Sequence, residues 1–407
     1  MAAEAGELVL YLGLGQSLLA LTPRQRPLGQ APGPVDPVRA WVLSASGTPR
    51  VADDPTQDLP GDALGETAPH LRDGRSGPLT AASAEILGAL GAEDRLLTVN
   101  LARRNTEIAA FLPGGAAFRN LERCLAHGVA LAAARGLRFE RLVVSWVQGQ
   151  ADARTPHSLY VDRLGALIDG IEAALAAVTG GKGSLLFCLS QTTAFYRAGR
   201  RGAALAQAEV AATRPGQVVM AGPEYMLERW DGVHLKPRGA VRLGVLHGRA
   251  IRRALLGEAW EPLRMVEAEV RGAEVRVRFA GGIGDLEHSV QGEGPVEVGV
   301  RPLEHFGFAW NPPRGVTTRI TAAQISGARE VTLTLSETPP HLEKTLLTLG
   351  FPHGIGLPEG FSGGDPAQAG GGATGLRTGG GGPDPVAGTL HDWALQQRIV
   401  PRWSETA

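Results

Sequence analysis

The chain has few of the residues that mark disulfide-stabilised, metal-binding or nucleic-acid-binding proteins. Its two cysteines, Cys124 and Cys188, each lie in an apolar stretch, so we predict two buried thiols and no disulfide framework. No group of cysteine and histidine has the spacing of a zinc site. The 40 Lys and Arg balance 41 Asp and Glu without a long block of one sign, which argues against nucleic acid or an anionic membrane as a partner.

A long hydrophobic run is also missing. Glu4 and Glu7 precede a short, glycine-broken apolar run with no basic segment before it, which predicts a buried strand and not a signal peptide. No stretch reaches the ~20 apolar residues of a membrane-spanning helix. We therefore expect a soluble, cytoplasmic or virion-associated protein. Its basic residues are almost all arginine, and alanine and glycine abound, which we interpret as GC-rich coding in a bacterium or phage.

Strand-like and helix-like segments alternate over the first 255 or so residues. Compact apolar runs predict strands buried on both faces at residues 8–12, 96–101, 142–146, 185–189 and 218–221. Periodic apolar residues predict helices at 119–134, 164–178 and 238–256. This alternation indicates an α/β domain over residues 1–260, with a parallel sheet between two helical layers. Ligands of such sheets bind outside the carboxyl ends of the strands.

The pattern changes near residue 262. Apolar and polar residues alternate at 275–279 and 331–335, which predicts a β-sandwich over residues 261–352. Residues 353–407 form a tail whose glycine-rich part, 354–385, we expect to be irregular, whereas its apolar end docks back. Two alternatives stay open for the Pro- and Gly-rich stretch 22–78, a loop that shapes a cleft or a passive insertion. Trp310 and neighbouring phenylalanines form either a sugar platform or, as we favour, core.

Ser17 follows the first apolar run in the sequence Gly15-Gln16-Ser17, where a helical pattern begins. A serine at a helix N-terminus would attack beside N–H groups that stabilise a developing oxyanion. Gly15 allows a tight turn and a close approach of substrate. The alternative is a serine that merely caps the helix.

Asp231-Gly232-Val233-His234 lies on a loop before the last predicted helix of the α/β domain. At this spacing the Asp231 carboxylate reaches the His234 imidazole, holds its tautomer and leaves the other ring nitrogen to take a proton from a serine. The alternative is a local Asp–His pair on a surface loop.

Gln148 belongs to a third motif, Trp146-Val147-Gln148-Gly149-Gln150, which follows the strand at 142–146. Its side-chain amide could donate to an oxyanion, although a polar exit from a strand is common. The three motifs all fall at one edge of the predicted sheet, and together they supply the parts of a serine esterase.

This set of motifs resembles the SGNH (GDSL-like) hydrolases, in particular the sialate O-acetylesterase and acetylxylan esterase branch, over about residues 7–255. The resemblance implies a flavodoxin-like fold with Ser17 as nucleophile, His234 as base and Asp231 as orienting acid. It also implies an oxyanion hole formed by the Ser17 N–H, Gln148 and a glycine, for which Gly115 of Pro113-Gly114-Gly115 is the nearest candidate.

The motifs depart from that branch at two positions, where Leu18 replaces an asparagine and Gln150 replaces a glutamate. We assign Gln16 and Gln150 to substrate binding. The expected reaction is ester hydrolysis through an acyl-enzyme, without metal or organic cofactor. The resemblance implies that the acyl group is acetyl and that the substrate is an O-acetylated carbohydrate. The alternatives are a lipid or thioester hydrolase, a virion-associated esterase that acts on host glycans, and a non-catalytic carbohydrate-binding or virion-associated structural module. As partners the protein could have further copies of itself, in a homo-oligomer, or a virion.

Overall fold

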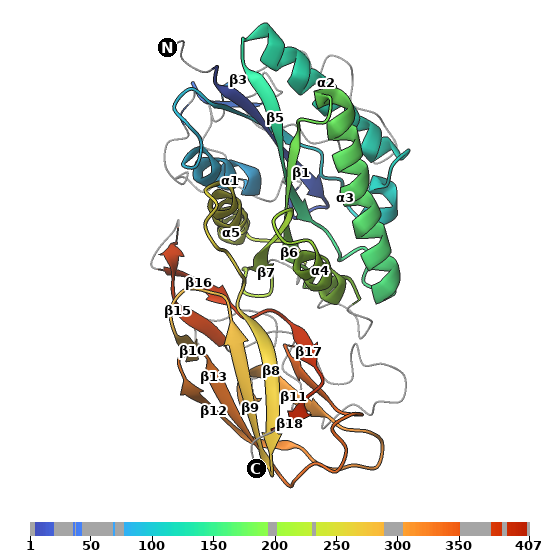
Figure 1. Ribbon diagram of the computed structural model, residues 1–407, viewed down its shortest axis with the longest axis vertical. Helices are drawn as coiled ribbons and strands as arrows, with labels where there is room; N and C mark the ends of the chain where they lie inside the picture. The colour runs from blue at the N-terminus through green and yellow to red at the C-terminus, as the bar shows by residue number, and fades with distance from the viewer. Residues whose placement is uncertain are drawn as a thin grey trace.

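The computed structural model consists of an α/β domain and a β part that lie end to end (Figure 1). It describes residues 5–19, 36, 38–42, 68–69, 77–193, 202–229, 233–288, 304–350, 376–384 and 389–404. Most of the stretch 22–78, which the sequence interprets as a cleft-shaping loop or a passive insertion, lies outside the described residues.

A seven-stranded sheet forms the centre of the α/β domain, in the order β3-β2-β4-β1-β5-β6-β7. Every neighbouring pair is parallel except β2 and β3. The strands are β1 (Glu7–Gly15), β2 (Ala40–Val42), β3 (Ala68–Pro69), β4 (Arg95–Asn100), β5 (Arg138–Val147), β6 (Ser184–Gln191) and β7 (Val218–Pro223). All five predicted strands are therefore confirmed.

The position of β1 determines where a ligand would bind. Its neighbours are β4 on one side and β5 on the other, so β4-β1-β5-β6-β7 has the flavodoxin-like order in which the connections change direction at the first strand. In such sheets the crevice opens at the carboxyl ends of the strands beside this switch point. The residues that follow β1 and β5 therefore lie at the expected binding crevice.

Helices cover both faces of this sheet (Figure 1). One face carries α1 (Pro78–Leu87) and α5 (Pro237–Leu255), and the other carries α2 (Ala116–Ala134), α3 (His157–Thr179), α4 (Gly202–Thr213) and the short 3₁₀ helix Ile108–Phe111. The layered α/β/α prediction is thus confirmed, and α1 and α4 are additions to it. Glycine lets α1 and α5 pack closely, because a Cβ on Gly244 would lie 2.0 Å from the Pro78 carbonyl oxygen. None of the described helices is long and apolar enough to cross a membrane.

The β part contains a five-stranded sheet, β12-β13-β9-β8-β18, and two three-stranded sheets, β10-β15-β16 and β11-β14-β17. Its strands are β8 (Arg264–Arg271), β9 (Glu274–Ala280), β10 (Leu286–His288), β11 (Phe308–Asn311), β12 (Ile320–Gly327), β13 (Glu330–Leu335), β14 (Leu346–Leu349), β15 (Leu376–Pro383), β16 (Thr389–Trp393), β17 (Gln397–Ile399) and β18 (Arg402–Trp403). Phe308 and Trp310 are buried in the core between the sheets, so they are no sugar platform. A 3₁₀ turn, Glu304–Gly307, precedes β11.

One part of the glycine-rich stretch forms a strand, which corrects the expectation of irregular structure there. Gly379 to Gly382 belong to β15, which pairs with β10 and β16. A side chain would obstruct this packing, because a Cβ on Gly380 would lie 2.2 Å from the Ile283 carbonyl oxygen. The remainder of that stretch, up to residue 375, lies outside the described residues.

The segment after β16 lies against the carboxyl edge of the α/β sheet. Gln191, the last residue of β6, donates to the Gln396 carbonyl oxygen (2.8 Å) and accepts from the Gln396 N–H (2.7 Å). The Tyr225 hydroxyl donates to the Ala394 carbonyl oxygen (2.6 Å). Leu395 is buried in the core on the α2–α4 face of the sheet. The end of the chain thus supports the exits of β6 and β7.

Both cysteines are buried thiols, as predicted, and burial raises the pKa of Cys124 to about 12. Cys188 lies near a buried polar group between β1, β5 and α5. There the Ser145 hydroxyl is 2.8 Å from the Tyr11 hydroxyl and 2.9 Å from His247 Nδ1. Nε2 of His247 has no hydrogen-bond partner among the described residues. Burial lowers the pKa of His247 from 6.5 to about 3, because a charged ring would lose its hydration.

We predict that His247 makes the fold sensitive to acid. Because the folded protein holds this ring neutral, its contribution is complete above pH 6.5 and is lost as the pH falls from 6.5 towards 3, as the unfolded chain takes up the proton. The loss is about 1.4 kcal/mol per pH unit, or about 2 kcal/mol between pH 6.5 and 5. Urea unfolding of wild type and His247→Leu at several pH values measures it, since the leucine variant should lack this slope. Equal slopes in the two proteins would refute the assignment.

Candidate active site

Ser17 lies directly after β1, at the carboxyl edge of the sheet, and its side chain is buried. Residues 17–19 form a turn, closed by a hydrogen bond from the Leu19 N–H to the Gln16 carbonyl oxygen (3.0 Å). We expected a helix to begin at Ser17, but residues 17–19, the last described ones of this segment, form a turn. Within the described part of the chain, neither the N–H nor the hydroxyl of Ser17 has a hydrogen-bond partner. Both groups remain available for a substrate.

A very close contact between the exits of β1 and β5 holds Ser17 in place. The Gln16 N–H donates to the Val147 carbonyl oxygen (2.9 Å), and Gly15 has a φ of 125°. A Cβ on Gly15 would lie 2.1 Å from that same carbonyl oxygen. Only glycine fits both the dihedral angle and the space. The sequence prediction that Gly15 permits a tight turn is therefore confirmed, although it is the neighbouring strand that makes the close approach.

The residue after the nucleophile position explains one departure from the expected motif. Leu18, where the resembling branch has asparagine, is fully buried. It belongs to the core on the α1–α5 side of the sheet, together with Leu227 and Leu235. Packing by Leu18 therefore anchors the Ser17 turn, and Leu235 anchors the loop that carries His234 in the same core.

His234 is partly buried on the loop between β7 and α5. The two ends of this loop pair with each other, because Arg229 and Leu235 form an antiparallel bridge and the Lys236 N–H donates to the Glu228 carbonyl oxygen (2.8 Å). Asp231 lies outside the described residues, so its predicted contact with His234 stays a prediction. The structure describes no hydrogen bond between Ser17 and His234, a contact that tightens in many enzymes only when substrate binds.

Gln148 lies at the carboxyl end of β5 as predicted, but its side-chain amide bonds to neighbouring loops instead of facing an oxyanion site. Its Nε2 donates to the Thr106 carbonyl oxygen (3.0 Å) and to Asp152 Oδ2 (2.5 Å). Its Oε1 accepts from the Tyr160 hydroxyl (2.7 Å). The side chain is fully buried, and both amide protons are used. In this arrangement Gln148 ties the loop after β4 to the exit of β5 and has no proton left for an oxyanion.

Gly115 is not available as an oxyanion donor either. It lies at the N-terminus of α2, and its N–H donates to the Leu112 carbonyl oxygen (3.0 Å). The atoms nearest to a Cβ at this position would be those of the Ala110 and Leu112 carbonyl groups. The glycine thus serves the turn into α2. It is a candidate from the sequence because the resemblance implies a glycine in the oxyanion hole, and Gly114-Gly115 offers the nearest match.

The two predicted substrate-binding glutamines join loops to one another. Gln16 Oε1 accepts from the Ala151 N–H (3.3 Å), which links the exits of β1 and β5. Gln150 Nε2 donates to Glu224 Oε2 (2.8 Å), which links the exits of β5 and β7. The side chains of both glutamines therefore hold the strand exits together at the carboxyl edge of the sheet.

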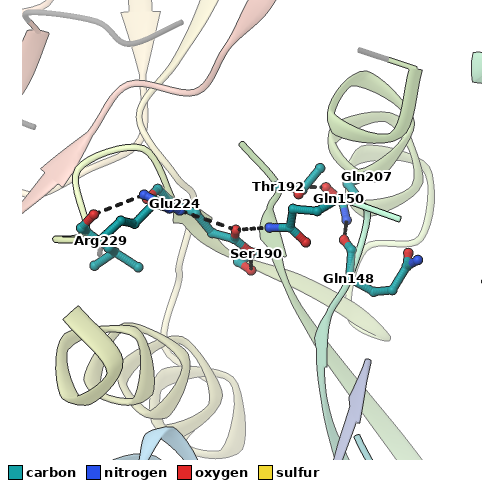
Figure 2. Close-up of polar contacts among 8 residues, drawn as sticks. Gln148, Gln150, Ser190, Thr192, Gln207, Glu224 and Arg229 are labelled. Atoms are coloured by element: carbon teal, nitrogen blue, oxygen red, sulfur yellow. Dashed lines mark hydrogen bonds and ion pairs between the residues drawn. The ribbon is translucent and has the colours of Figure 1, made fainter. Parts of the chain in front are cut away.

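Glu224 is the residue of this edge that the sequence analysis missed. It directly follows β7 and is completely buried. Figure 2 shows its polar contacts. Besides Gln150 it accepts from the Ser190 hydroxyl at the end of β6 (2.7 Å), and its Oε2 lies 3.7 Å from Arg229 Nη2. Burial raises the pKa of Glu224, whereas Arg229 and the two hydrogen bonds oppose that rise. The signal in the sequence was a carboxylate at a strand exit, but no motif surrounds it.

A second part of this polar edge lies beside Gln148. Gln207 of α4 accepts from the Thr192 N–H through Oε1 (2.8 Å) and donates through Nε2 to the Gln148 carbonyl oxygen (2.6 Å). Figure 2 shows both parts of the edge, with Gln150 between them. The exits of β5, β6 and β7 are thus joined by buried amide and carboxyl groups, as polar groups removed from water require.

A hollow of about 670 Å³ lies elsewhere, between α4 and the segment after β16. Its lining includes His157, Trp260 and Leu395 but none of the three motifs. Within the described part of the chain, no three His, Cys, Asp or Glu side chains are grouped as metal ligands.

We predict that Gly15→Ala strongly destabilises the protein. The added Cβ would clash with the Val147 carbonyl oxygen and require a φ that only glycine adopts easily, at a cost of more than about 3 kcal/mol. Gly216→Ala is the matched control, because Gly216 also has a positive φ but has open space around its Cβ position. We expect that control to cost about 1 to 2 kcal/mol. Urea unfolding measures both, and equal losses would refute the close-approach argument.

Comparison with known proteins identifies the fold. No protein-family model and no curated protein matches the sequence. A carbohydrate acetylesterase from Xanthomonas citri has a similar structure, with 16% identity, a TM-score of 0.57, and coverage of 96% of this chain and 80% of that one. A protein from Arabidopsis thaliana matches with 18% identity and a TM-score of 0.39, over 61% of this chain and 98% of that one. The chain therefore has the fold of the Xanthomonas enzyme over nearly its whole length.

Proposed function

We propose that the protein is a serine esterase that hydrolyses acetyl esters, with O-acetylated carbohydrate as its substrate. Ser17 is the nucleophile, His234 its general base and Asp231 the acid that orients the histidine. The substrate class rests on the motif resemblance and on the likeness to a carbohydrate acetylesterase. Neither metal nor organic cofactor takes part in the proposed reaction.

The observation that carries this proposal is the position of Ser17. It follows the strand at the switch point of a flavodoxin-like sheet, held there by the contact between Gly15 and Val147. Its N–H and hydroxyl have no hydrogen-bond partner among the described residues. This is unusual for a polar residue that is only 5% exposed, because buried polar groups are normally bonded. A helix cap would have its hydroxyl bonded to a backbone N–H. The arrangement favours a reactive serine over a structural one.

In the proposed reaction Ser17 Oγ attacks the ester carbonyl carbon while His234 takes its proton. The Ser17 N–H donates to the oxyanion of the tetrahedral intermediate. This intermediate collapses to an acetyl-enzyme, and the sugar alcohol leaves with the proton from His234. Water then attacks the acetyl group with His234 again acting as base, and acetate and free Ser17 result. Gln148 and Gly115 hold the surrounding loops and donate no hydrogen bond to the oxyanion.

Labelling by a fluorophosphonate probe tests whether Ser17 is activated. We expect wild type to be labelled and Ser17→Ala to remain unlabelled while keeping its melting temperature, because the probe reacts only with an activated nucleophile. Ser184→Ala is a control with an exposed serine at the start of β6. Equal labelling of wild type and Ser17→Ala would place the nucleophile elsewhere. Absence of labelling in folded wild type would favour the non-catalytic carbohydrate-binding or virion-associated module.

Replacement of His234 tests the proposed base. We expect His234→Asn to lower kcat for p-nitrophenyl acetate by about 10²–10⁴-fold, since proton transfer by a positioned base contributes that much. His341→Asn should leave kcat unchanged, because His341 lies exposed in the β part. A His234→Asn enzyme within threefold of wild type would contradict the assignment of the base.

A further inference from the structure

A buried ion pair lies beneath the loop that carries His234. Arg229 is buried, and its Nη2 lies 3.7 Å from Oε2 of the fully buried Glu224. Nη1 of Arg229 also donates to the Glu224 carbonyl oxygen (2.7 Å) and to the Leu227 carbonyl oxygen (3.0 Å). Figure 2 shows the two side chains facing each other. Arg229 is thereby fixed to the exit of β7 by both charge and geometry.

The backbone of Arg229 fixes the loop itself. Arg229 forms an antiparallel bridge with Leu235, which is the residue that follows His234. The proposed base and its acid lie on the loop between these two paired residues. A shift of Arg229 would therefore move the His234 loop relative to the sheet.

The other contacts of Glu224 reach back towards Ser17. Its carboxylate accepts from Ser190 and from Gln150, at the exits of β6 and β5. Beside Gln150, the Ala151 N–H donates to Gln16, the residue before Ser17. One carboxylate thus connects the loop of the proposed base to the exit of the strand that carries the proposed nucleophile.

We propose that Glu224 and Arg229 are positioning residues of the esterase, which hold the His234 loop in register with Ser17. The inference rests on the proposed function. Neither residue touches substrate. They set the distance over which His234 takes the serine proton, and a misplacement of about 1 Å at such a step can cost about 10²-fold in rate.

The same contact explains the second departure from the expected motif. The resembling branch has glutamate where this chain has Gln150. A glutamate here would bring two carboxylates within hydrogen-bond distance of each other in a buried site, where they repel. Glutamine donates a hydrogen bond instead. The carboxyl group of this region is therefore supplied by Glu224, where Arg229 can pair with it.

The test compares kcat, KM and melting temperature for wild type, Glu224→Gln, Arg229→Lys and the double variant Glu224→Gln/Arg229→Met, with p-nitrophenyl acetate. We expect both single variants to lose about 10- to 100-fold in kcat with KM within threefold. Lysine keeps the charge of Arg229 but lacks the planar fork that directs Nη1 at the two carbonyl oxygens and Nη2 at the Glu224 carboxylate. Asp392→Asn is the control. Asp392 is a buried carboxylate of β16 that accepts a hydrogen bond from the Ile283 N–H (2.9 Å), and its replacement should lower only the melting temperature.

The double variant separates positioning from stability. It removes both charges, so no charge is left unpaired and the melting temperature should return towards that of wild type. Its kcat should stay at least tenfold low, because the bonds from Arg229 to the two carbonyl groups are still missing. Recovery of kcat together with melting temperature, or single variants within threefold of wild type, would overturn the positioning role. If Glu224→Gln does not fold, Arg229→Lys and the double variant decide.

Ser17→Ala, measured in parallel, distinguishes this inference from the proposed function. An active Ser17→Ala protein would overturn both. An inactive Ser17→Ala protein beside fully active Glu224 and Arg229 variants would overturn the positioning role alone.

Discussion

The contact between the exits of β1 and β5 is the constraint on which the candidate site depends. Gly15 lies so close to the Val147 carbonyl oxygen that no side chain fits. The N–H of the next residue, Gln16, donates a hydrogen bond to that same oxygen. This contact ends β1 with Ser17 at the switch point of the sheet. The parallel sheet provides the crevice at the carboxyl ends of its strands. Gly15 allows β1 to end there, so that Ser17 lies in the crevice.

Buried polar groups then hold the neighbouring strand exits together. Gln148 joins the loop after β4 to β5, and Glu224 joins the exits of β5, β6 and β7. Such a network is stable only when its members are bonded, since an unpaired buried polar group is costly. The tail contributes to this region as well, because Gln396 pairs with Gln191 at the end of β6. Residues far apart in the sequence therefore share one polar layer.

The fold could be predicted where a single sequence pattern dominates. The five apolar runs became strands because a parallel sheet buries both faces of each one. The α4 helix was missed because it is alanine-rich and shows no polar face, and α1 follows a stretch rich in proline and glycine. The strand containing Gly379 to Gly382 was missed since glycine runs are typical of loops. Its glycines are needed because the backbones of Ile283 and Leu390 and the side chains of Glu287 and Arg249 lie where their Cβ atoms would be.

The site could be predicted in position but not in its hydrogen bonds. The motifs placed Ser17 and Gln148 at the carboxyl edge, because each directly follows an apolar run. They could not show that the Gln148 amide donates both of its hydrogen bonds to Thr106 and Asp152, because only the folded loops bring those partners to it. Glu224 escaped notice for the same reason. Its importance comes from burial and from partners 5 to 74 positions away in the sequence.

The proposed reaction requires that Ser17 and His234 meet at the switch point of the sheet. The most direct measurement is a crystal structure of the protein after reaction with a small fluorophosphonate. We expect phosphorus bonded to Ser17 Oγ, with a ring nitrogen of His234 within about 3.2 Å of that oxygen or one water away. A phosphorus atom on another side chain, or a His234 ring turned away with no path to Ser17, would contradict it.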